Sequence, residues 1–288
     1  MAVVQIQTDP RVAAAANRCA RSRFLVSLVG AALLGIAATV PASAGGCTAP
    51  PDLVDLGAPL PKLLTAVRTN SPVRIVALGS SSTWGAGASS RAHSYPARLE
   101  RELRVTWPNN DVRVINAGVN GQLARDMVAR IDKDVVPHKP QLVVWQTGVN
   151  DAIKEVPLDA YGQLLQTGIE RFRALGADVV LIDQQFYPRF AKLKNGALYM
   201  AAMRETALKL KVPVVQRYRI MQHLIASAQF TTATLLAPDQ FHLNDQSYDC
   251  MGRLLAQSLR SAAALPPAAP AVAPAVAVPA VSKHEANM

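Results

Sequence analysis

The sequence lacks several features that would assign it to a function class directly. It has no run of basic residues interleaved with aromatic ones, although 30 Lys and Arg against 20 Asp and Glu give a net charge of +10. Nucleic-acid binding is therefore not expected, and the dispersed charge fits contact with anionic surfaces or polymers equally well. Charged residues make up only 17% against 50% hydrophobic ones, which excludes a disordered or collagen-like chain.

Motifs for phosphate, dinucleotide or metal binding are also missing. The glycine-rich segment 79–87 has no Gly-Lys-Ser/Thr at P-loop spacing, no three-glycine dinucleotide fingerprint and no G-x-S-x-G elbow. The five histidines lie apart, without the three or four convergent ligands of a zinc site. We therefore expect no metal and no organic cofactor.

The N-terminus has the pattern of a secretory signal. Residues 1–23 are polar and basic, residues 24–40 are apolar, and small residues follow at 41–44, where a signal peptidase cleaves. The apolar stretch is shorter than the roughly 20 strongly apolar residues that span a bilayer comfortably. We expect 1–44 to be a cleaved signal peptide of a periplasmic or secreted protein without stable membrane insertion; an uncleaved anchor is the less favoured alternative.

Cleavage behind Ala44 would leave two cysteines, Cys47 and Cys250. An even pair in an exported chain can bridge in an oxidising compartment, so a Cys47–Cys250 disulfide is one hypothesis and two buried thiols are the alternative. The bridge would join residues 45–71, here called the N-terminal strap, to the last helix. Across a loop of about 200 residues it would stabilise the fold by about 4 kcal/mol in the chain-entropy model.

The C-terminal residues have a composition that does not build a folded element. Residues 265–281 repeat proline, alanine and valine without a charge, which favours extended polyproline II and gives no amphipathic face. Residues 265–288 are therefore predicted to be a disordered tail, and the folded domain is assigned to residues 72–264.

Short apolar runs alternate with segments of helical spacing inside this domain. The runs are continuous and mostly rich in β-branched residues, as in strands that are buried on both faces. The runs occupy 73–78, 112–116, 142–146, 179–183 and 212–216, and the helical patterns occupy 96–105, 123–133, 158–175, 197–211 and 246–264. The alternation predicts an α/β fold with a five-stranded parallel sheet covered by helices on both faces. Its ligand site should lie beyond the carboxyl ends of the strands.

A glycine and hydroxyl cluster follows the first predicted strand. Segment 79–87 contains Ser80, Ser81 and Ser82 at a sharp turn where a nucleophile can be exposed. Taken alone, a serine-rich turn of this kind is more often a helix cap.

Glycine and asparagine follow the second and third predicted strands. A structural explanation is that Gly118 and Gly148 adopt positive φ and that Asn150 or Asp151 caps the next helix. A functional explanation is that the Gly118 N–H and the Asn150 amide point at one anion, as in an oxyanion hole.

An aspartate and a histidine lie three residues apart before the last helix. Asp239 can hold the ring of His242 in one tautomer and stabilise its imidazolium form, which leaves the other nitrogen free to act as a base. The alternative is an ordinary hydrogen bond within a loop.

The four segments just described, after the first three predicted strands and before the last helix, occur in the order of the sequence blocks of the SGNH (GDSL) hydrolase family. The chain resembles this family over about residues 73–264. The resemblance implies a Ser81 nucleophile, a His242 base and an Asp239 that orients it. It also implies an oxyanion hole formed by the N–H groups of Ser81 and Gly118 and the amide of Asn150.

One residue departs from the family pattern. The usual Gly-Asp-Ser is Gly79-Ser80-Ser81 here, so the carboxylate beside the nucleophile is missing. The position of the nucleophile among Ser80, Ser81 and Ser82 is then ambiguous, and the spacing to Thr83 and Gly85 favours Ser81.

The resemblance implies a three-layer flavodoxin-like sandwich and a serine esterase that hydrolyses acyl or acetyl esters through an acyl-enzyme. The signal pattern at residues 1–44 predicts that this esterase is secreted. Lipase, lysophospholipase or thioesterase activity and deacetylation of a carbohydrate are all compatible with it, so the partner is a small acyl ester or an acetylated glycan. A module of the same fold that binds an acylated polysaccharide without catalysis is the alternative.

Overall fold

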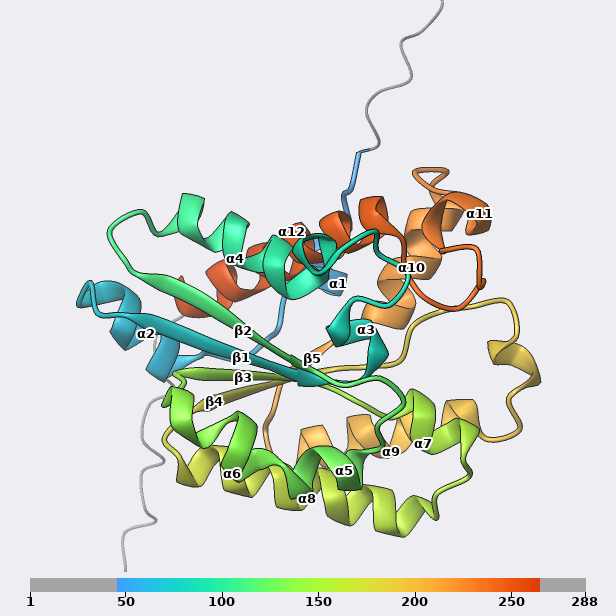
Figure 1. Cartoon of the computed structure of the whole chain (residues 1–288), viewed down its shortest axis with the longest axis horizontal. Coiled ribbons are helices and arrows are strands. Elements are labelled where there is room, and N and C mark those ends of the chain that lie inside the picture. Colours follow the sequence, from blue (N-terminus) through green and yellow to red (C-terminus); the bar gives the residue numbers. More distant parts are fainter. Residues whose placement is uncertain (1–45, 265–288) are drawn as a thin grey trace, which may run out of the picture. The chain divides into compact units, whose positions relative to one another are not determined.

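The computed structural model describes residues 46–264, which form an α/β sandwich (Figure 1). The predicted signal peptide (1–44) and tail (265–288) lie outside the described residues. Among the helices that the structure describes, none is long and apolar enough to cross a bilayer.

Five parallel strands form one sheet, as the sequence predicts. In the sheet they lie in the order β2-β1-β3-β4-β5. Because the chain runs outward from β1 to β2 and then returns to β3 on the other side, the carboxyl ends of β1 and β3 flank the point where a ligand binds in such sheets. The strands are β1 (Val73–Gly79), β2 (Val112–Gly118), β3 (Leu142–Gln146), β4 (Asp178–Ile182) and β5 (Val214–Val215).

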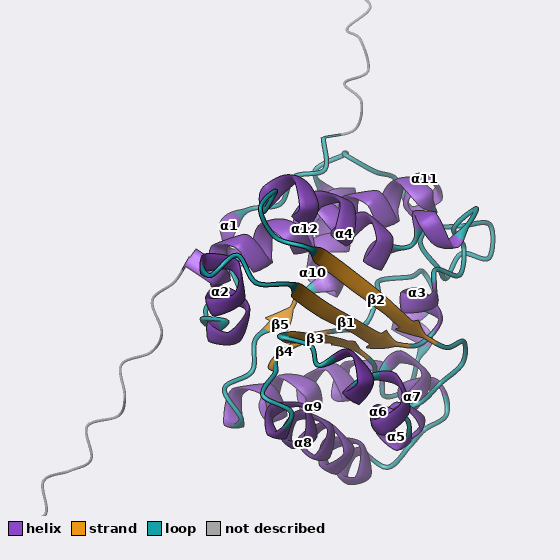
Figure 2. Ribbon diagram, turned by 60° about the vertical axis from the view of Figure 1, so that its left-hand side comes forward, coloured by secondary structure: helices purple, strands orange, loops and turns teal. Residues whose placement is uncertain are grey.

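Helices cover both faces of the sheet (Figure 2). Alternate side chains of β1 are buried in the two layers, Ile75 and Ala77 in one and Val76 and Leu78 in the other, because side chains of a strand alternate between its faces. One layer holds α1 (Pro51–Val54), α2 (Pro61–Arg68), α4 (Tyr95–Thr106), α10 (Arg217–Ala226) and α12 (Asp245–Ala264). The other holds α5 (Ala124–Ala129), α6 (Ile131–Asp134), α8 (Leu158–Ala174) and α9 (Gly196–Lys209).

The structure has two helices where the sequence predicts one over residues 123–133. The helix is interrupted at Arg130, which has φ −103° and ψ 11° and separates α5 from α6. The Arg130 guanidinium donates to Gly79 O at 3.0 Å and to Ala117 O at 2.8 Å. One buried arginine therefore binds carbonyls at the ends of β1 and β2, where the site is expected.

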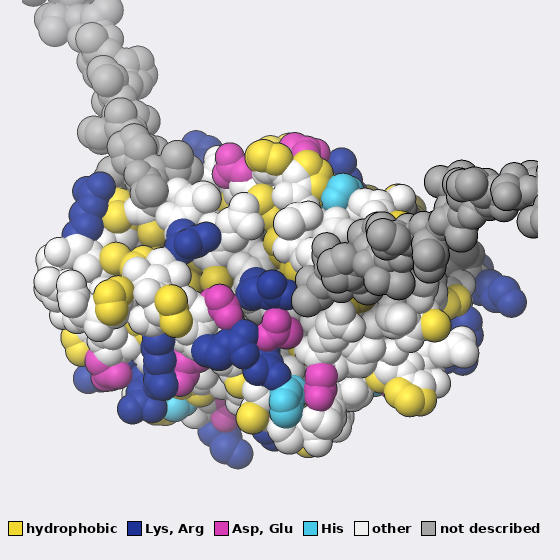
Figure 3. Space-filling model, turned by 90° about the horizontal axis from the view of Figure 1, so that it is seen from above, with side chains coloured by type: hydrophobic (Ala, Val, Ile, Leu, Met, Phe, Trp, Pro, Cys, Tyr) yellow, Lys and Arg dark blue, Asp and Glu magenta, His cyan; other side chains and the backbone are white. Residues whose placement is uncertain are grey.

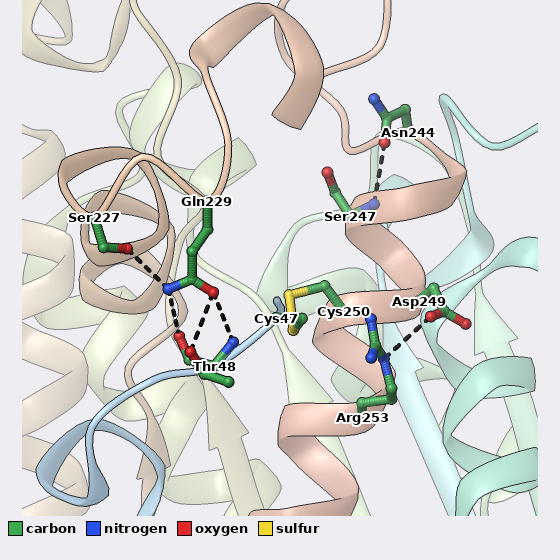
Figure 4. Close-up of a disulfide and its surroundings, with 9 residues drawn as sticks. All are labelled: Cys47, Thr48, Ser227, Gln229, Asn244, Ser247, Asp249, Cys250 and Arg253. Atoms are coloured by element: carbon green, nitrogen blue, oxygen red, sulfur yellow. Dashed lines mark hydrogen bonds and ion pairs between the residues drawn. A yellow bond between two sulfur atoms is a disulfide. The ribbon is translucent and has the colours of Figure 1, made fainter. Parts of the chain in front are cut away.

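A disulfide joins Cys47 to Cys250 on α12, with a Cα–Cα distance of 5.4 Å (Figure 4). Beside it, Thr48 N donates to Gln229 Oε1 at 2.8 Å, and Gln229 Nε2 donates back to Thr48 O at 2.9 Å. The disulfide fixes the strap to α12, the helix that begins directly after the segment containing His242, and the Thr48 hydrogen bonds fix it to the segment that follows α10.

Reduction of this disulfide is expected to lower Tm by roughly 10 °C, because the bridge closes a loop of 203 residues and removes conformational entropy from the unfolded chain. Thermal unfolding of oxidised and reduced protein would measure the difference, with thiol titration to verify reduction. An unchanged Tm after complete reduction would contradict the expectation.

The face formed by α4 and α12 carries charges of both signs (Figure 3). Asp249 on α12 forms ion pairs with Arg98 at 3.6 Å, Arg101 at 2.6 Å and Arg253 at 3.1 Å. On this face, basic side chains are therefore paired with carboxylates and do not gather into a patch of one sign.

Candidate active site

Ser81 begins a one-turn helix, α3 (Ser81–Trp84), that follows β1 directly. Ser80 is its N-cap, and the Ser80 carbonyl accepts from Thr83 N at 3.1 Å and Trp84 N at 2.9 Å. The first N–H groups of a helix have no acceptor inside the helix. Within the described residues, the Ser81 N–H donates to no protein acceptor and is free for a ligand.

A short hairpin presents Asp239 and His242. Its base is an antiparallel bridge between Leu236 and Leu243, and Ala237 N donates to His242 O at 2.8 Å. Gln240 turns the chain with a left-handed φ of 53°. This turn directs the Asp239 carboxylate toward the N–H groups of Phe241 and His242.

Asp239 uses both carboxylate oxygens. Oδ1 accepts from the N–H groups of Phe241 and His242, both at 3.0 Å, and Oδ2 lies 2.6 Å from His242 Nδ1. Burial alone raises the pKa of Asp239, but the hydrogen bonds from the His242 ring and the two N–H groups outweigh it, and the pKa lies below its ordinary value. The carboxylate is therefore ionised and fixes the ring.

Ser81 and His242 meet although they are 161 residues apart. His242 Nε2 lies 2.8 Å from Ser81 Oγ, within hydrogen-bond distance. The Ser81 residue is 8% exposed and the His242 side chain 15% exposed, so a ligand can still approach both. The structure thus aligns a hydroxyl, an imidazole and a carboxylate in the order that nucleophilic catalysis requires.

Asn150 lies on α7 (Val149–Ile153), whose N-cap is Gly148 with φ 103°. One Asn150 Nδ2–H donates to Gln122 O at 2.9 Å, and a side-chain amide has a second N–H for a ligand. Asp151 does not cap its own helix. It is buried and accepts from Ala124 N at 3.0 Å, at the first residue of α5.

Gly118 differs from the expectation in two ways. It is absent from the positive-φ residues of the described chain, so the prediction of a positive φ is wrong. Its N–H already donates to Asn116 Oδ1 at 3.0 Å, and an oxyanion would have to compete with Asn116 for it. Glycine is required here because a Cβ would lie 2.6 Å from Trp84 Cα. The structure therefore explains Gly118 by close packing of β2 against α3.

Aromatic side chains lie beside His242 and on the helix that begins at Ser81. Phe241 lies edge-on to the His242 ring at 4.8 Å between centroids, and Tyr187 lies edge-on to Phe241 at 4.7 Å. Trp84, one turn after Ser81, is 38% exposed, and the Arg91 guanidinium lies 5.1 Å from its ring centroid. The sequence interpretation missed Trp84, although its position in the serine-rich turn is a usable signal.

Within residues 46–264, no group of three or more His, Cys, Asp or Glu side chains is placed to hold a metal ion.

Comparison with known proteins gives the family. Residues 46–265 match the model of the non-GDSL lipase-like family. The chain belongs to this family. The resemblance to SGNH hydrolases is confirmed, and the family description agrees with the missing aspartate at Ser80.

Curated relatives of the non-GDSL lipase-like protein include enzymes named as esterases. It is 30% identical over 98 residues to an acetylxylan esterase of Geobacillus stearothermophilus, covering 31% of this chain and 45% of that protein. It is 25% identical over 116 residues to an arylesterase of Vibrio mimicus, covering 37% of this chain and 58% of that one. The chain thus spans about half the length of the curated relatives it matches.

A solved structure confirms the fold. A two-domain esterase (CEX) active on acetylated mannans aligns with a TM-score of 0.62 and 20% identity, over 76% of this chain and 57% of that one.

Proposed function

We propose that the protein is an exported serine esterase that hydrolyses acyl or acetyl esters through an acyl-enzyme on Ser81. The observation that carries this proposal is the continuous contact from Ser81 Oγ through the His242 ring to Asp239 Oδ2, at 2.8 and 2.6 Å. The esterase names of the curated relatives support the same reaction class.

The proposed reaction uses two similar half-cycles. His242 Nε2 takes the Ser81 proton while Oγ attacks the ester carbonyl carbon, and Asp239 stabilises the imidazolium that forms. The tetrahedral intermediate collapses, the alkoxide leaves with the proton from Nε2, and the acyl group stays on Oγ. Water then attacks the acyl-enzyme with His242 again as base, and the acid is released.

The Ser81 N–H and the Asn150 amide are the proposed oxyanion donors, with the Gly118 N–H as a third donor once it is released from Asn116. Donors of this kind stabilise negative charge that develops only in the transition state. The free Ser81 N–H at the start of α3 supports this role, because helix N-termini favour anions.

Asn150→Ala is expected to reduce kcat by about 10²- to 10³-fold, because one oxyanion donor is lost. The change also removes the Asn150 hydrogen bond to Gln122 O, so Tm is measured beside kcat on p-nitrophenyl acetate. A lower Tm with unchanged kcat would assign Asn150 a structural role and remove it from the oxyanion hole.

The pH profile of kcat/KM is expected to fall on the acid side with a slope of one proton. A protonated His242 cannot accept the Ser81 proton, so activity decreases when the pH falls far enough to protonate the ring. The pKa of Asp239 is held below its ordinary value by the His242 ring and two N–H groups against the effect of burial, so Asp239 stays ionised there. A flat profile, or a slope of two protons, would contradict this assignment.

Acetyl esters on a glycan are the substrate class that we favour. The relatives named for acetylxylan and acetylated mannans support it. So does Trp84, because residues three apart on a helix lie on the same side and this exposed ring therefore lies near Ser81. An exposed indole beside a guanidinium offers a flat apolar face and hydrogen-bond donors to a sugar.

Trp84→Ala tests this substrate class. It is expected to raise KM for acetylated xylo-oligosaccharides about 10-fold, while kcat/KM for p-nitrophenyl acetate stays nearly unchanged, and Trp84→Phe should retain most binding. Equal losses on both substrates would contradict a sugar contact. A screen of p-nitrophenyl esters from acetate to palmitate tests the alternative substrate class. A preference for long acyl chains in that screen would contradict acetyl esters as the substrate.

A binding module without catalysis is the rival proposal, and the missing aspartate at position 80 is its only support. The Ser81–His242–Asp239 contacts argue against it, because binding alone does not require a base aligned on a hydroxyl.

Export to the periplasm or the medium is part of the proposal. The Cys47–Cys250 disulfide supports it, since such bonds persist in oxidising compartments. The domain limits 45–71 and 72–264 remain sequence predictions.

A further inference from the structure

Gln146, the last residue of β3, lies beneath the turn that carries Ser81. Its Oε1 accepts from Ser80 N at 3.1 Å, from Ser80 Oγ at 3.2 Å and from Thr83 Oγ1 at 3.1 Å. Gln146 and Thr83 are fully buried and Ser80 is 1% exposed, so water does not compete for these hydrogen bonds. One carbonyl oxygen thus holds both the N-cap and the third residue of α3.

The orientation of the Gln146 amide is determined by its partners. The Ser80 backbone N–H can only donate, so the atom facing it must be the oxygen. Within the described residues, Gln146 Nε2 is buried and has no hydrogen-bond partner. An unpartnered buried donor is unfavourable, so the three contacts to Oε1 offset a real cost.

Two further residues, Tyr95 and Gly79, stabilise the contact between Thr83 and Gln146 Oε1. Tyr95 Oη lies 3.1 Å from Thr83 Oγ1, and burial raises the pKa of Tyr95 to about 12, so its hydroxyl stays protonated. Tyr95 then donates to Thr83, and Thr83 donates to Gln146. Glycine at position 79 makes room, because a Cβ there would lie 2.8 Å from Gln146 Oε1.

The turn needs such a support. A helix of one turn, such as α3, has almost no stability of its own. The direction of the Ser81 N–H and of Oγ depends on the backbone of Ser80, which Gln146 holds. In this chain, position 80 has no carboxylate, and both the N–H and the hydroxyl of Ser80 donate to Gln146 Oε1.

We propose that Gln146 is a positioning residue that holds Ser81 in line with His242 and directs the Ser81 N–H to the oxyanion. It acts through Ser80 and Thr83 and touches no substrate. The effect on turnover rests on the proposed esterase function, whereas the effect on the turn does not.

The test compares substitutions at Gln146 with the same change at an equally buried glutamine. Gln146→Met keeps the length of the side chain and removes the acceptor, and is expected to lower kcat about 100-fold with little change in KM. Gln146→Glu keeps an acceptor oxygen and should retain kcat within about 10-fold. The control is Gln185→Met, since Gln185 is 1% exposed, its Oε1 accepts from Arg217 at 3.0 Å and its Nε2 has no hydrogen-bond partner among the described residues. It should lower Tm but leave kcat within a few-fold.

Two further readouts separate positioning from general destabilisation. Thr83→Val combined with Gln146→Met should lower kcat by much less than the product of the single effects, because both remove the same support. Hydrogen exchange of the Thr83 and Trp84 amides should be faster in Gln146→Met than in wild type or Gln185→Met.

The exchange measurement keeps the two proposals distinguishable. If wild type hydrolyses no ester, the proposed function fails and the exchange rates still decide the role of Gln146. Unchanged exchange and kcat in Gln146→Met, or equal losses in Gln185→Met, would overturn the proposal.

Discussion

Ser81→Ala is expected to reduce kcat on p-nitrophenyl acetate by roughly 10⁴- to 10⁶-fold. The substitution removes the oxygen that forms the acyl-enzyme, and the base and oxyanion donors that remain provide only a small residual rate. The measurement is kcat for purified wild-type and variant protein, with Tm to verify that both are folded.

Ser82→Ala is the matched control for this prediction, because Ser82 is also buried in the same turn. Its kcat should stay within a few-fold of wild type, since the His242 ring bonds Ser81 and, in the part of the chain that the structure describes, no hydrogen bond joins Ser82 to His242. Wild-type turnover in Ser81→Ala, or an equal loss in Ser82→Ala, would contradict the choice of nucleophile.

Asp239→Asn is expected to lower kcat by about 10⁴-fold while the protein remains folded. The asparagine carbonyl can still accept from the N–H groups of Phe241 and His242, so the hairpin is preserved. Its NH₂ would face His242 Nδ1 in place of an acceptor, which favours the tautomer that donates to Ser81 and cannot accept the Ser81 proton. The effect appears in kcat and leaves Tm within a few degrees.

A loss of less than about 10-fold in Asp239→Asn would contradict an orienting role for Asp239. A large fall in Tm would instead mark the carboxylate as a structural support of the hairpin. The pH profile of the variant gives a second check, since its acid limb should shift when the ring loses its carboxylate partner.

The sequence predicts the sheet well because strands buried on both faces leave a continuous apolar signal. Four of the five predicted strands begin within one residue of the observed β1 to β4. β5 is limited to Val214–Val215, because Pro213 has no N–H for a ladder. The break at Arg130 could not be predicted, since it accompanies contacts with carbonyls on β1 and β2 that are distant in sequence.

The site is predictable where local spacing determines the chemistry. Asp239 and His242 lie three residues apart, and the hairpin between Leu236 and Leu243 converts that spacing into a contact. Gly118 shows the limit of this reasoning, because its N–H partner and its contact with Trp84 depend on tertiary packing.

Gln146 was missed for a related reason. A polar residue that ends an apolar strand is a visible signal, but only the fold shows that Ser80 and Thr83, more than 60 residues earlier, donate to it.

The most direct test of the central claim is labelling with a fluorophosphonate, followed by mass spectrometry of the intact protein and of its peptides. The account predicts one phosphonyl adduct on Ser81, formed by attack of its Oγ with loss of fluoride, and strongly reduced labelling in His242→Ala. Absence of an adduct in folded wild-type protein, or an adduct on Ser80 or Ser82, would contradict it.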